Sequence, residues 1–252
     1  MNKLPQITLA FWVMKICATT LGETAGDLLS MTLNVGYALS SLILISVFVL
    51  TLITQLMAKT YKPLLYWIVI LSTSTAGTTM SDFMDRTLGL GYATGSMILI
   101  AILLAIFAAW RLSGDSLNVS KVQTFRGEMF YWMAILFSNT LGTALGDYLA
   151  DDSGLGFAGG ALLIGSTIAV VVLLKYFTKI SSVLLFWVAF VLTRPFGATL
   201  GDLMTKSHEK GGLDFGTIGS SAVLAAILLV MIVGASYAQK RYGKPQITAE
   251  LS

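Results

Sequence analysis

The sequence predicts an all-α integral membrane protein with eight transmembrane helices, built from four parallel two-helix repeats. Hydrophobic residues make up 56% of the 252 residues and charged residues only 12%, whereas about a quarter of the residues in a soluble domain are charged. Apolar segments of about 20 residues recur along the chain, and each is long enough to cross a hydrocarbon core of about 30 Å as a helix. An internal repeat places two such segments in every copy.

The apolar segments leave almost no chain for a separate soluble domain. They lie near residues 8–28, 38–58, 64–84, 92–110, 129–150, 157–177, 182–204 and 217–238. The short segments of alternating polarity typical of a transmembrane β-barrel are missing from the sequence. We therefore expect one membrane domain, with a cytoplasmic tail at 240–252. The repeats are expected at 8–58, 63–112, 128–178 and 183–239.

Four tryptophans anchor the internal repeat. Each follows an aromatic residue, and each is followed ten positions later by a glycine and fifteen positions later by an aspartate. The repeated helix reads WVMKICATTLGETAGD (12–27), WIVILSTSTAGTTMSD (67–82), WMAILFSNTLGTALGD (132–147) and WVAFVLTRPFGATLGD (187–202). Because each copy holds two spans, every copy enters the membrane from the same side. This predicts pseudo-fourfold or nested twofold symmetry about the membrane normal.

The distribution of basic residues predicts the orientation of the chain. Eleven lysines and arginines fall at the two termini and in the connections after the second, fourth and sixth spans, against three in the opposite loops. The positive-inside rule therefore places both termini in the cytoplasm. The net charge of +3 reflects this bias and gives no indication of nucleic-acid binding.

Polar residues of the repeated helix follow one stripe, at 3, 7, 11 and 15 positions after the tryptophan. The stripes are Lys15, Thr19, Glu23 and Asp27; Ile70, Ser74, Thr78 and Asp82; Ile135, Asn139, Thr143 and Asp147; and Phe190, Arg194, Ala198 and Asp202. A central charge that faced lipid would cost about 2.5–3.5 kcal/mol, so the stripe should face the bundle interior or a wet cavity.

With the tryptophans at the cytoplasmic interface, the four aspartates would form a layer in the outer half of the membrane. Four neighbouring carboxylates repel one another, which allows them to share protons or a cation. The alternative is that each aspartate caps or hydrogen-bonds the start of the helix that follows it.

A neighbouring stripe holds small residues in every copy. It consists of Gly22 and Gly26, Gly77 and Ser81, Gly142 and Gly146, and Gly197 and Gly201. Small residues four positions apart let helix backbones approach closely in a membrane. We expect them to pack against the small-residue starts of the second helix of each copy.

Differences between the copies point to a site, because a purely structural requirement would apply to all four. Only the first copy has Lys15 and Glu23, and only the fourth has Arg194 followed by Pro195. Glu23 is a candidate partner for Arg194, and Pro195 is expected to kink its helix. Lys15 either finds a partner inside the bundle or extends toward the cytoplasmic surface.

The candidate ion-binding or proton-coupling residues are therefore ten polar residues of the four stripes. They are Glu23, Asp27, Asp82, Asp147, Asp202, Arg194, Lys15, Asn139, Thr19 and Ser74. The remaining polar groups are expected to be solvated loop residues, including the surface histidine. These are Asp85, Arg86, Asp151, Asp152 and the segment 206–212 with His208.

The tryptophan, glycine and aspartate spacing resembles that of a bacterial family of multi-pass membrane proteins made of four tandem copies of a repeat of unknown function. The resemblance covers nearly the whole chain and implies an integral fold in the bacterial inner membrane. It implies no catalytic or binding residues. The fourth copy departs from the others by an insertion after Asp202.

The first functional hypothesis is a transporter or channel for a small ion, with or without proton coupling. The carboxylates of Glu23, Asp27, Asp82, Asp147 and Asp202 suit a hard cation such as Mn²⁺ or Mg²⁺. One cysteine and one histidine exclude a zinc-type cluster. The alternative is a non-transporting scaffold or sensor, in which the repeated aspartates and glycines are structural.

The sequence favours no enzymatic activity. It shows no nucleophile paired with a base and no histidine pair for haem, so we expect no cofactor. The expected partners are the lipid bilayer and a small ion, with no nucleic acid, and the oligomeric state stays open.

Overall fold

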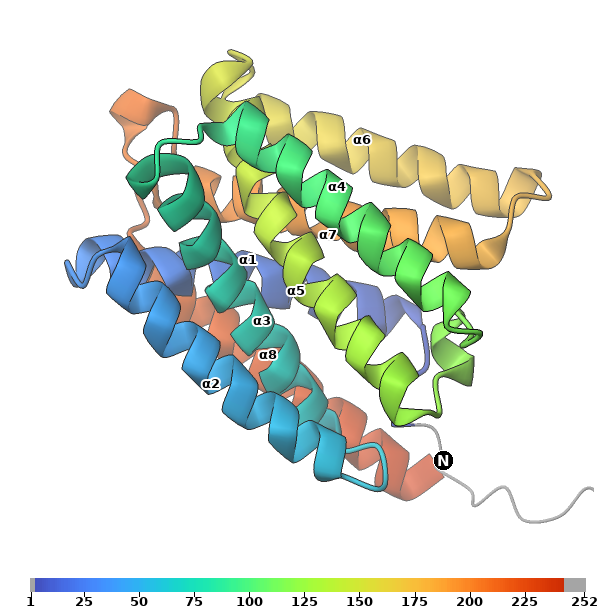
Figure 1. The fold of residues 1–252 in the computed structure, drawn as a ribbon. Helices are drawn as coiled ribbons and strands as arrows, with labels where there is room; N and C mark the ends of the chain where they lie inside the picture. The colour runs from blue at the N-terminus through green and yellow to red at the C-terminus, as the bar shows by residue number, and fades with distance from the viewer. Residues whose placement is uncertain (1–2, 243–252) are drawn as a thin grey trace, which may run out of the picture.

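The computed structural model of the chain describes residues 3–242, and side chains as far as residue 237. The described residues form α-helices and short helical turns, with no strand. The helices are α1 (Leu9–Asp27), α2 (Tyr37–Met57), α3 (Pro63–Asp82), α4 (Tyr92–Leu112), α5 (Phe125–Asp147), α6 (Gly156–Phe177), α7 (Ser182–Thr205) and α8 (Thr217–Tyr242). Each apolar segment predicted from the sequence coincides with one of them (Figure 1). The tail expected at 240–252 lies outside the described residues after its first three positions.

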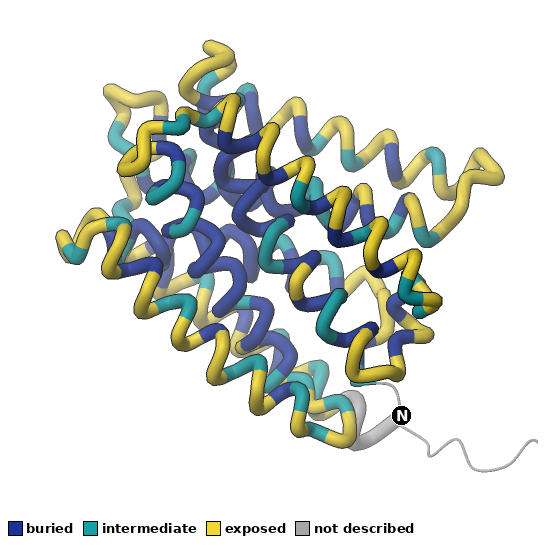
Figure 2. Tube along the Cα trace, in the orientation of Figure 1, coloured by how far each residue is buried: buried dark blue, intermediate teal, exposed yellow. Residues whose placement is uncertain are grey.

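The odd-numbered helices form the centre of the molecule. Helix α1 packs against α3, α3 against α5, α5 against α7, and α7 against α1, so these four helices close into a ring. Helices α2, α4 and α6 each pack against the odd-numbered helix that follows them, and α8 packs against α1. Burial is accordingly concentrated on the central helices, while the outer helices alternate between exposed and buried positions (Figure 2). The ring places the polar stripe of each copy in the interior.

Within the described part of the chain, five helices are long and apolar enough to cross a membrane, namely α2, α4, α6, α7 and α8. Helices α1, α3 and α5 are of similar length but less apolar, because much of their surface consists of buried threonine, serine, glycine and carboxylate residues. Apolar side chains of the outer helices therefore face outward, while the polar side chains of the central helices are enclosed. This distribution is the one expected of a helical membrane protein.

Helices α1, α3 and α5 each continue into a five-residue π-helical turn directly after the repeated aspartate. These turns are Leu28–Thr32, Phe83–Thr87 and Tyr148–Asp152. Helix α7 instead ends at Thr205 and is followed by a 3-10 turn at His208–Lys210, which is where the fourth copy carries its insertion. Helix α8 nevertheless packs on α1 as the other outer helices pack on theirs.

The small residues bring the odd-numbered helices against one another. A Cβ atom added to Gly26 would lie 2.8 Å from Cβ of Thr78, and one added to Gly201 would lie 2.9 Å from Cβ of Glu23. The expected packing against the starts of the even-numbered helices is therefore wrong. In the same way, Gly22 faces Ser74, Gly77 faces Asn139, Gly142 faces Arg194, Gly146 faces Ala198, and Gly197 faces Thr19. Each copy thus presents its glycines to the polar stripe of the next copy around the ring.

Eight aromatic side chains form a collar at the end of the ring where the odd-numbered helices begin. The aromatic residue before each tryptophan contacts the tryptophan of the next copy. The ring centroids are 5.7 Å apart for Phe11 and Trp67, 5.6 Å for Tyr66 and Trp132, 6.0 Å for Tyr131 and Trp187, and 5.7 Å for Phe186 and Trp12. Trp67, Trp132 and Trp187 are buried and Trp12 is half-buried, so three of the four tryptophans pack inside the bundle and do not face lipid as interface anchors would.

Candidate ion-binding site

A column of charged side chains runs along the inside of the ring. Seven of them come from the polar stripes of α1, α3, α5 and α7, and all seven are buried: Lys15, Glu23, Asp27, Asp82, Asp147, Arg194 and Asp202. The stripe spacing of four residues stacks these groups in layers about 6 Å apart along the helices. The sequence therefore predicted correctly which face of each helix carries the buried charge.

The central layer is an ion pair between α1 and α7. Nη1 of Arg194 lies 2.9 Å from Oε2 of Glu23, and both side chains are almost completely enclosed. Nη2 of Arg194 donates to Oγ1 of Thr78 at 2.6 Å and to Oγ1 of Thr143 at 2.7 Å. Each of these hydroxyls donates in turn to Oε2 of Glu23. The pairing of Glu23 with Arg194 suggested by the sequence is thus present, and α3 and α5 complete it.

Lys15 lies in the layer nearer the aromatic collar and is fully buried. Its Nζ atom is 4.3 Å from the centroid of the Phe190 ring and 3.5 Å from Oδ1 of Asn139. Nδ2 of Asn139 donates to Oγ1 of Thr73 at 2.9 Å. The alternative in which Lys15 extends toward the cytoplasmic surface is therefore wrong. Among the described residues, no carboxylate forms an ion pair with Lys15.

Two other stripe residues are buried beside the column. Oγ1 of Thr19 lies within hydrogen-bonding distance of three backbone oxygens, at 2.9 Å from Ile16, 3.0 Å from Lys15 and 3.2 Å from Thr193 on α7. Oγ of Ser74 is buried and has no hydrogen-bond partner within the described part of the chain. Thr19 thus serves the contact between α1 and α7, while Ser74 retains unused hydrogen-bonding capacity.

The four repeated aspartates form the layer at the other end of the column. Nζ of Lys206 lies 2.6 Å from Oδ2 of Asp27 and 3.0 Å from Oδ1 of Asp202. Arg86 bridges the other two aspartates, with Nε 2.9 Å from Oδ1 of Asp82 and Nη2 3.1 Å from Oδ2 of Asp147. Each cation therefore joins the aspartate of its own copy to that of the next copy.

The first three repeated aspartates do not cap the helices that follow them. The three π-helical turns begin after Asp27, Asp82 and Asp147 without a side-chain capping hydrogen bond, and helices α2, α4 and α6 have none either. For the first three copies the capping alternative is wrong, because Asp27 pairs with Lys206, and Asp82 and Asp147 pair with Arg86.

The expectation that Lys206 and Asp85 are solvated is wrong, whereas Arg86 is exposed as expected but lies in a π-helical turn and not in a loop. Arg86 and Lys206 pair with the aspartate layer, and Asp85 is buried, accepting from Oγ of Ser81 at 3.2 Å. The sequence did contain a signal for the two cations, because each follows an aspartate by four residues in helical register. Asp151, Asp152 and His208 are exposed, as expected.

Lys206 lies just beyond the end of α7, in a largely enclosed position. Burial opposes its positive charge, but Asp202 and Asp27 outweigh that effect and raise the pKa of Lys206 above its ordinary value. The side chain is therefore held as a cation between the two carboxylates.

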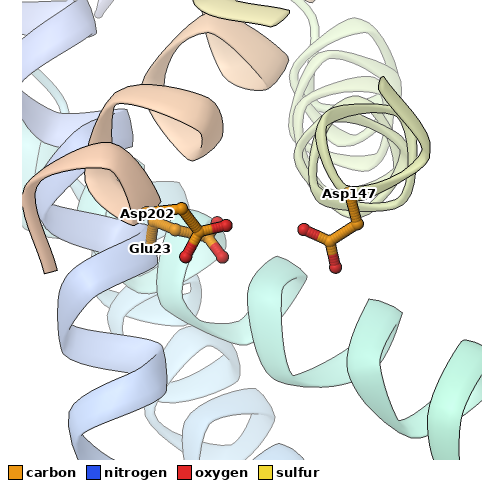
Figure 3. A group of neighbouring side chains, drawn as sticks. All are labelled: Glu23, Asp147 and Asp202. Carbon is orange, nitrogen blue, oxygen red and sulfur yellow. The ribbon is translucent and has the colours of Figure 1, made fainter. Parts of the chain in front are cut away.

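Glu23, Asp147 and Asp202 come together as a group of three carboxylates, and one oxygen from each lies within 4.8 Å of the other two. Figure 3 shows the carboxylates of Glu23 and Asp202 side by side and that of Asp147 pointing toward them from α5. Asp27 and Asp82, which were predicted to belong to the same binding layer, are outside this group.

The spacing of this group is compatible with a hard divalent cation. Ligands on opposite sides of Ca²⁺ lie about 4.6–5.2 Å apart, and those on opposite sides of Mg²⁺ about 4.0–4.2 Å apart. Oxygens that all lie within 4.8 Å of one another are therefore close enough to reach one divalent cation placed between them. The threonine hydroxyls beside Glu23 are further hard ligands.

The fourfold organisation also appears in a comparison with protein families. The model described as Repeat of Unknown Function (DUF347) matches residues 10–61, 65–116, 130–181 and 185–242. The chain belongs to this family. Comparison with curated proteins and with solved structures gave no match. The resemblance identified in the sequence is thereby confirmed, and each DUF347 copy contains one inner and one outer helix of the ring.

The charges of the column do not balance. Five carboxylates, Glu23 and the four repeated aspartates, lie along it with four basic groups, Lys15, Arg86, Arg194 and Lys206. If every group is ionised, one negative charge is left over. A bound cation or a proton would neutralise it, and burial makes neutralisation favourable.

Proposed function

We propose that the protein is a transporter for a small hard cation in the bacterial inner membrane, with the group of Glu23, Asp147 and Asp202 as its binding site. The observation that carries this proposal is the buried column of charged side chains inside the ring. Charged groups within a membrane domain are costly and typically serve ion or proton pathways. A ring that needed only to pack could use apolar side chains at these positions without loss of stability.

In this proposal all eight helices cross the bilayer and both termini are cytoplasmic. Helices α1, α3 and α5, which are less apolar, would cross it with their polar stripes enclosed by the ring. The copies are related by a nested twofold axis along the membrane normal. Support comes from the two bridging cations, because Arg86 occurs in the second copy and Lys206 at the same position of the fourth. The first and third copies have Met31 and Asp151 there.

The proposed substrate is a divalent cation such as Mn²⁺ or Mg²⁺, exchanged for protons. Carboxylate and hydroxyl oxygens are ligands for hard cations. Cys17 donates to the backbone oxygen of Leu224 and His208 is in a loop, so neither contributes a soft ligand to the group. A cation that binds displaces protons from carboxylates that share them. We propose no enzymatic activity, and the lipid bilayer and the ion as partners.

A scaffold is the second candidate, and one observation favours it. All four repeated aspartates are already paired with Arg86 or Lys206. Such pairs would fix the order of the helices around the ring even if no ion moved through it.

Flux measurements separate the two functions. Purified protein is reconstituted into vesicles, and entry of Mn²⁺ is followed with a fluorescent indicator, together with internal pH. Asp147→Asn and Asp202→Asn should insert and fold as the original chain does but lose Mn²⁺ flux, whereas Asp152→Asn, at the exposed end of a π-helical turn, should retain it. Full flux in both of the first two variants contradicts the assignment of the site. Absence of flux for Mn²⁺, Mg²⁺ and Ca²⁺ in the original protein would support the scaffold.

A further inference from the structure

The guanidinium group of Arg194 occupies a shell of oxygen atoms contributed by the three other helices of the ring. Its acceptors are Oε2 of Glu23 on α1, Oγ1 of Thr78 and the backbone oxygen of Ser74 on α3, and Oγ1 of Thr143 on α5. A carboxylate, two hydroxyls and a carbonyl are also the ligands that a hard metal ion takes. The position therefore already holds a cation, one that is covalently attached to α7.

We infer that Arg194 is a tethered competitor of the transported cation: it neutralises Glu23 when the site is empty, and the substrate must displace it. This inference rests on the proposed function, because it concerns the same binding site. It adds that Glu23 is paired with Arg194 when the site is empty and with the substrate cation when the site is occupied.

The differences between the copies fit this role. In the layer of Glu23, the first copy supplies a carboxylate and the second and third supply threonine hydroxyls, but the fourth supplies Ala198. The fourth copy instead sends Arg194 into the layer from one helical turn earlier. Three copies therefore provide the oxygens, and the fourth provides the positive charge.

Glu23 belongs to two sets of contacts at once. Its Oε2 atom receives Arg194, Thr78 and Thr143, and the same carboxylate is a member of the group with Asp147 and Asp202. A divalent cation in that group would approach Arg194 closely in a site with little water. Like charges repel strongly there, and one carboxylate cannot compensate both, so occupancy by the metal and by Arg194 should be mutually exclusive.

Arg194 and the neighbouring Ser74 each have a polar atom without a hydrogen-bond partner among the described residues, on the side toward which Arg194 would move. Nε of Arg194 is buried and has no acceptor among the described residues. Oγ of Ser74 is buried and without a partner as well, and the backbone oxygen of the same residue already accepts from Nη2 of Arg194 at 3.3 Å. A small displacement away from Glu23, toward Ser74, can therefore exchange one acceptor for another.

Metal binding by variants of the full chain tests the inference. Mn²⁺ affinity is measured by titration calorimetry on the purified protein in lipid nanodiscs. Arg194→Gln should bind Mn²⁺ more tightly, by about 5- to 150-fold, the range of typical coupling between two sites. Lys15→Gln is the matched control, because it removes an equally buried positive charge from the column but one that does not contact Glu23. Its affinity should change far less.

A rescue experiment covers the case in which Arg194→Gln is too unstable to purify. In Arg194→Ala, free guanidinium ion should raise the melting temperature and weaken Mn²⁺ binding, because it can occupy the vacated shell. It should do neither in the original protein, where Arg194 fills that shell.

The outcomes distinguish the inference from the function on which it rests. If the original protein neither binds nor transports Mn²⁺, Mg²⁺ or Ca²⁺, the proposed function fails and the inference with it. If the original protein binds Mn²⁺ but Arg194→Gln binds it no more tightly, the inference is overturned and the transport proposal stands. Equal tightening in Lys15→Gln also overturns it, because general electrostatics would then explain the effect. Absence of guanidinium competition in Arg194→Ala counts against it in the same way.

Discussion

Replacing Gly77 by alanine should loosen the contact between α3 and α5. The added Cβ atom would lie 2.9 Å from the backbone carbon of Asn139 and from the backbone nitrogen of Thr140, whereas ordinary contacts begin at 3.4 Å. The two helices must therefore separate locally by about 0.5 Å, the difference between these distances. Because the obstructing atoms are backbone, we expect an overpacking cost of about 2–3 kcal/mol. The better helix propensity of alanine offsets about 1 kcal/mol of it, which leaves a net loss of about 1–2 kcal/mol.

Gly234→Ala is the matched control for this substitution. Gly234 lies within α8 and no atom comes within 4 Å of an added Cβ, so only the propensity effect applies and stability should be unchanged or slightly increased. Both variants are compared with the original chain by reversible unfolding in mixed detergent micelles. The reasoning is refuted if Gly77→Ala is as stable as Gly234→Ala, because the ring would then tolerate a wider spacing of its central helices.

Three further predictions follow from the ion pairs and side-chain hydrogen bonds of the structure. Glu23→Gln and Arg194→Gln should each lower the free energy of unfolding by about 3–5 kcal/mol, since each leaves a buried charge unpaired. The double variant should lose less than the sum, and additive losses in unfolding experiments would contradict the pairing. Arg86→Gln leaves two buried aspartates without their shared cation, so its melting temperature should rise as pH is lowered from 7 to 5, while Lys210→Gln, in an exposed turn, should show no such gain. Hydrogen bonds from Thr124 and Arg126 lower the pKa of Asp115 below its ordinary value of 3.8. The ionised carboxylate therefore stabilises the folded protein above pH 3.8, and this stabilisation is lost as the pH falls through the lower pKa of the folded state. Asp115→Asn should accordingly destabilise the protein at pH 7 but not at pH 2.

The sequence determined much of the ring because the repeated helix is strongly patterned. The stripe spacing of four residues identified which face of α1, α3, α5 and α7 is buried, and the charge unique to one copy identified Glu23 and Arg194 as partners. Both inferences need only helical geometry and the cost of exposing charge to lipid. The kink expected at Pro195 stays a prediction, since α7 runs through this residue as one helix.

The sequence did not predict which helices pack against each other in the ring. A stripe of small residues indicates that another helix packs closely against it, but it does not indicate which helix that is. The partners are the next inner helices because their own stripes carry short side chains such as Ser74 and Thr19 at the contact. The cations at the aspartate layer were missed for a related reason: Arg86 and Lys206 follow the last apolar residues of their segments, so composition suggested loops, while the chain continues in register beyond the aspartates.

Closure of the ring has a consequence for how the protein is made. The ion pair between Glu23 and Arg194 joins residues 171 positions apart in the chain, and the outer helix that packs on α1 is α8, the last described helix. During synthesis the first copies would enter the membrane with Glu23 unmatched, and the last copy would supply the missing positive charge. A chain truncated before Arg194 should therefore be recognisable to membrane quality control as an open ring with an exposed carboxylate. In the proposed transporter, Glu23 can pair with Arg194 only once α7 has been made, so the ion site would be assembled late in biogenesis.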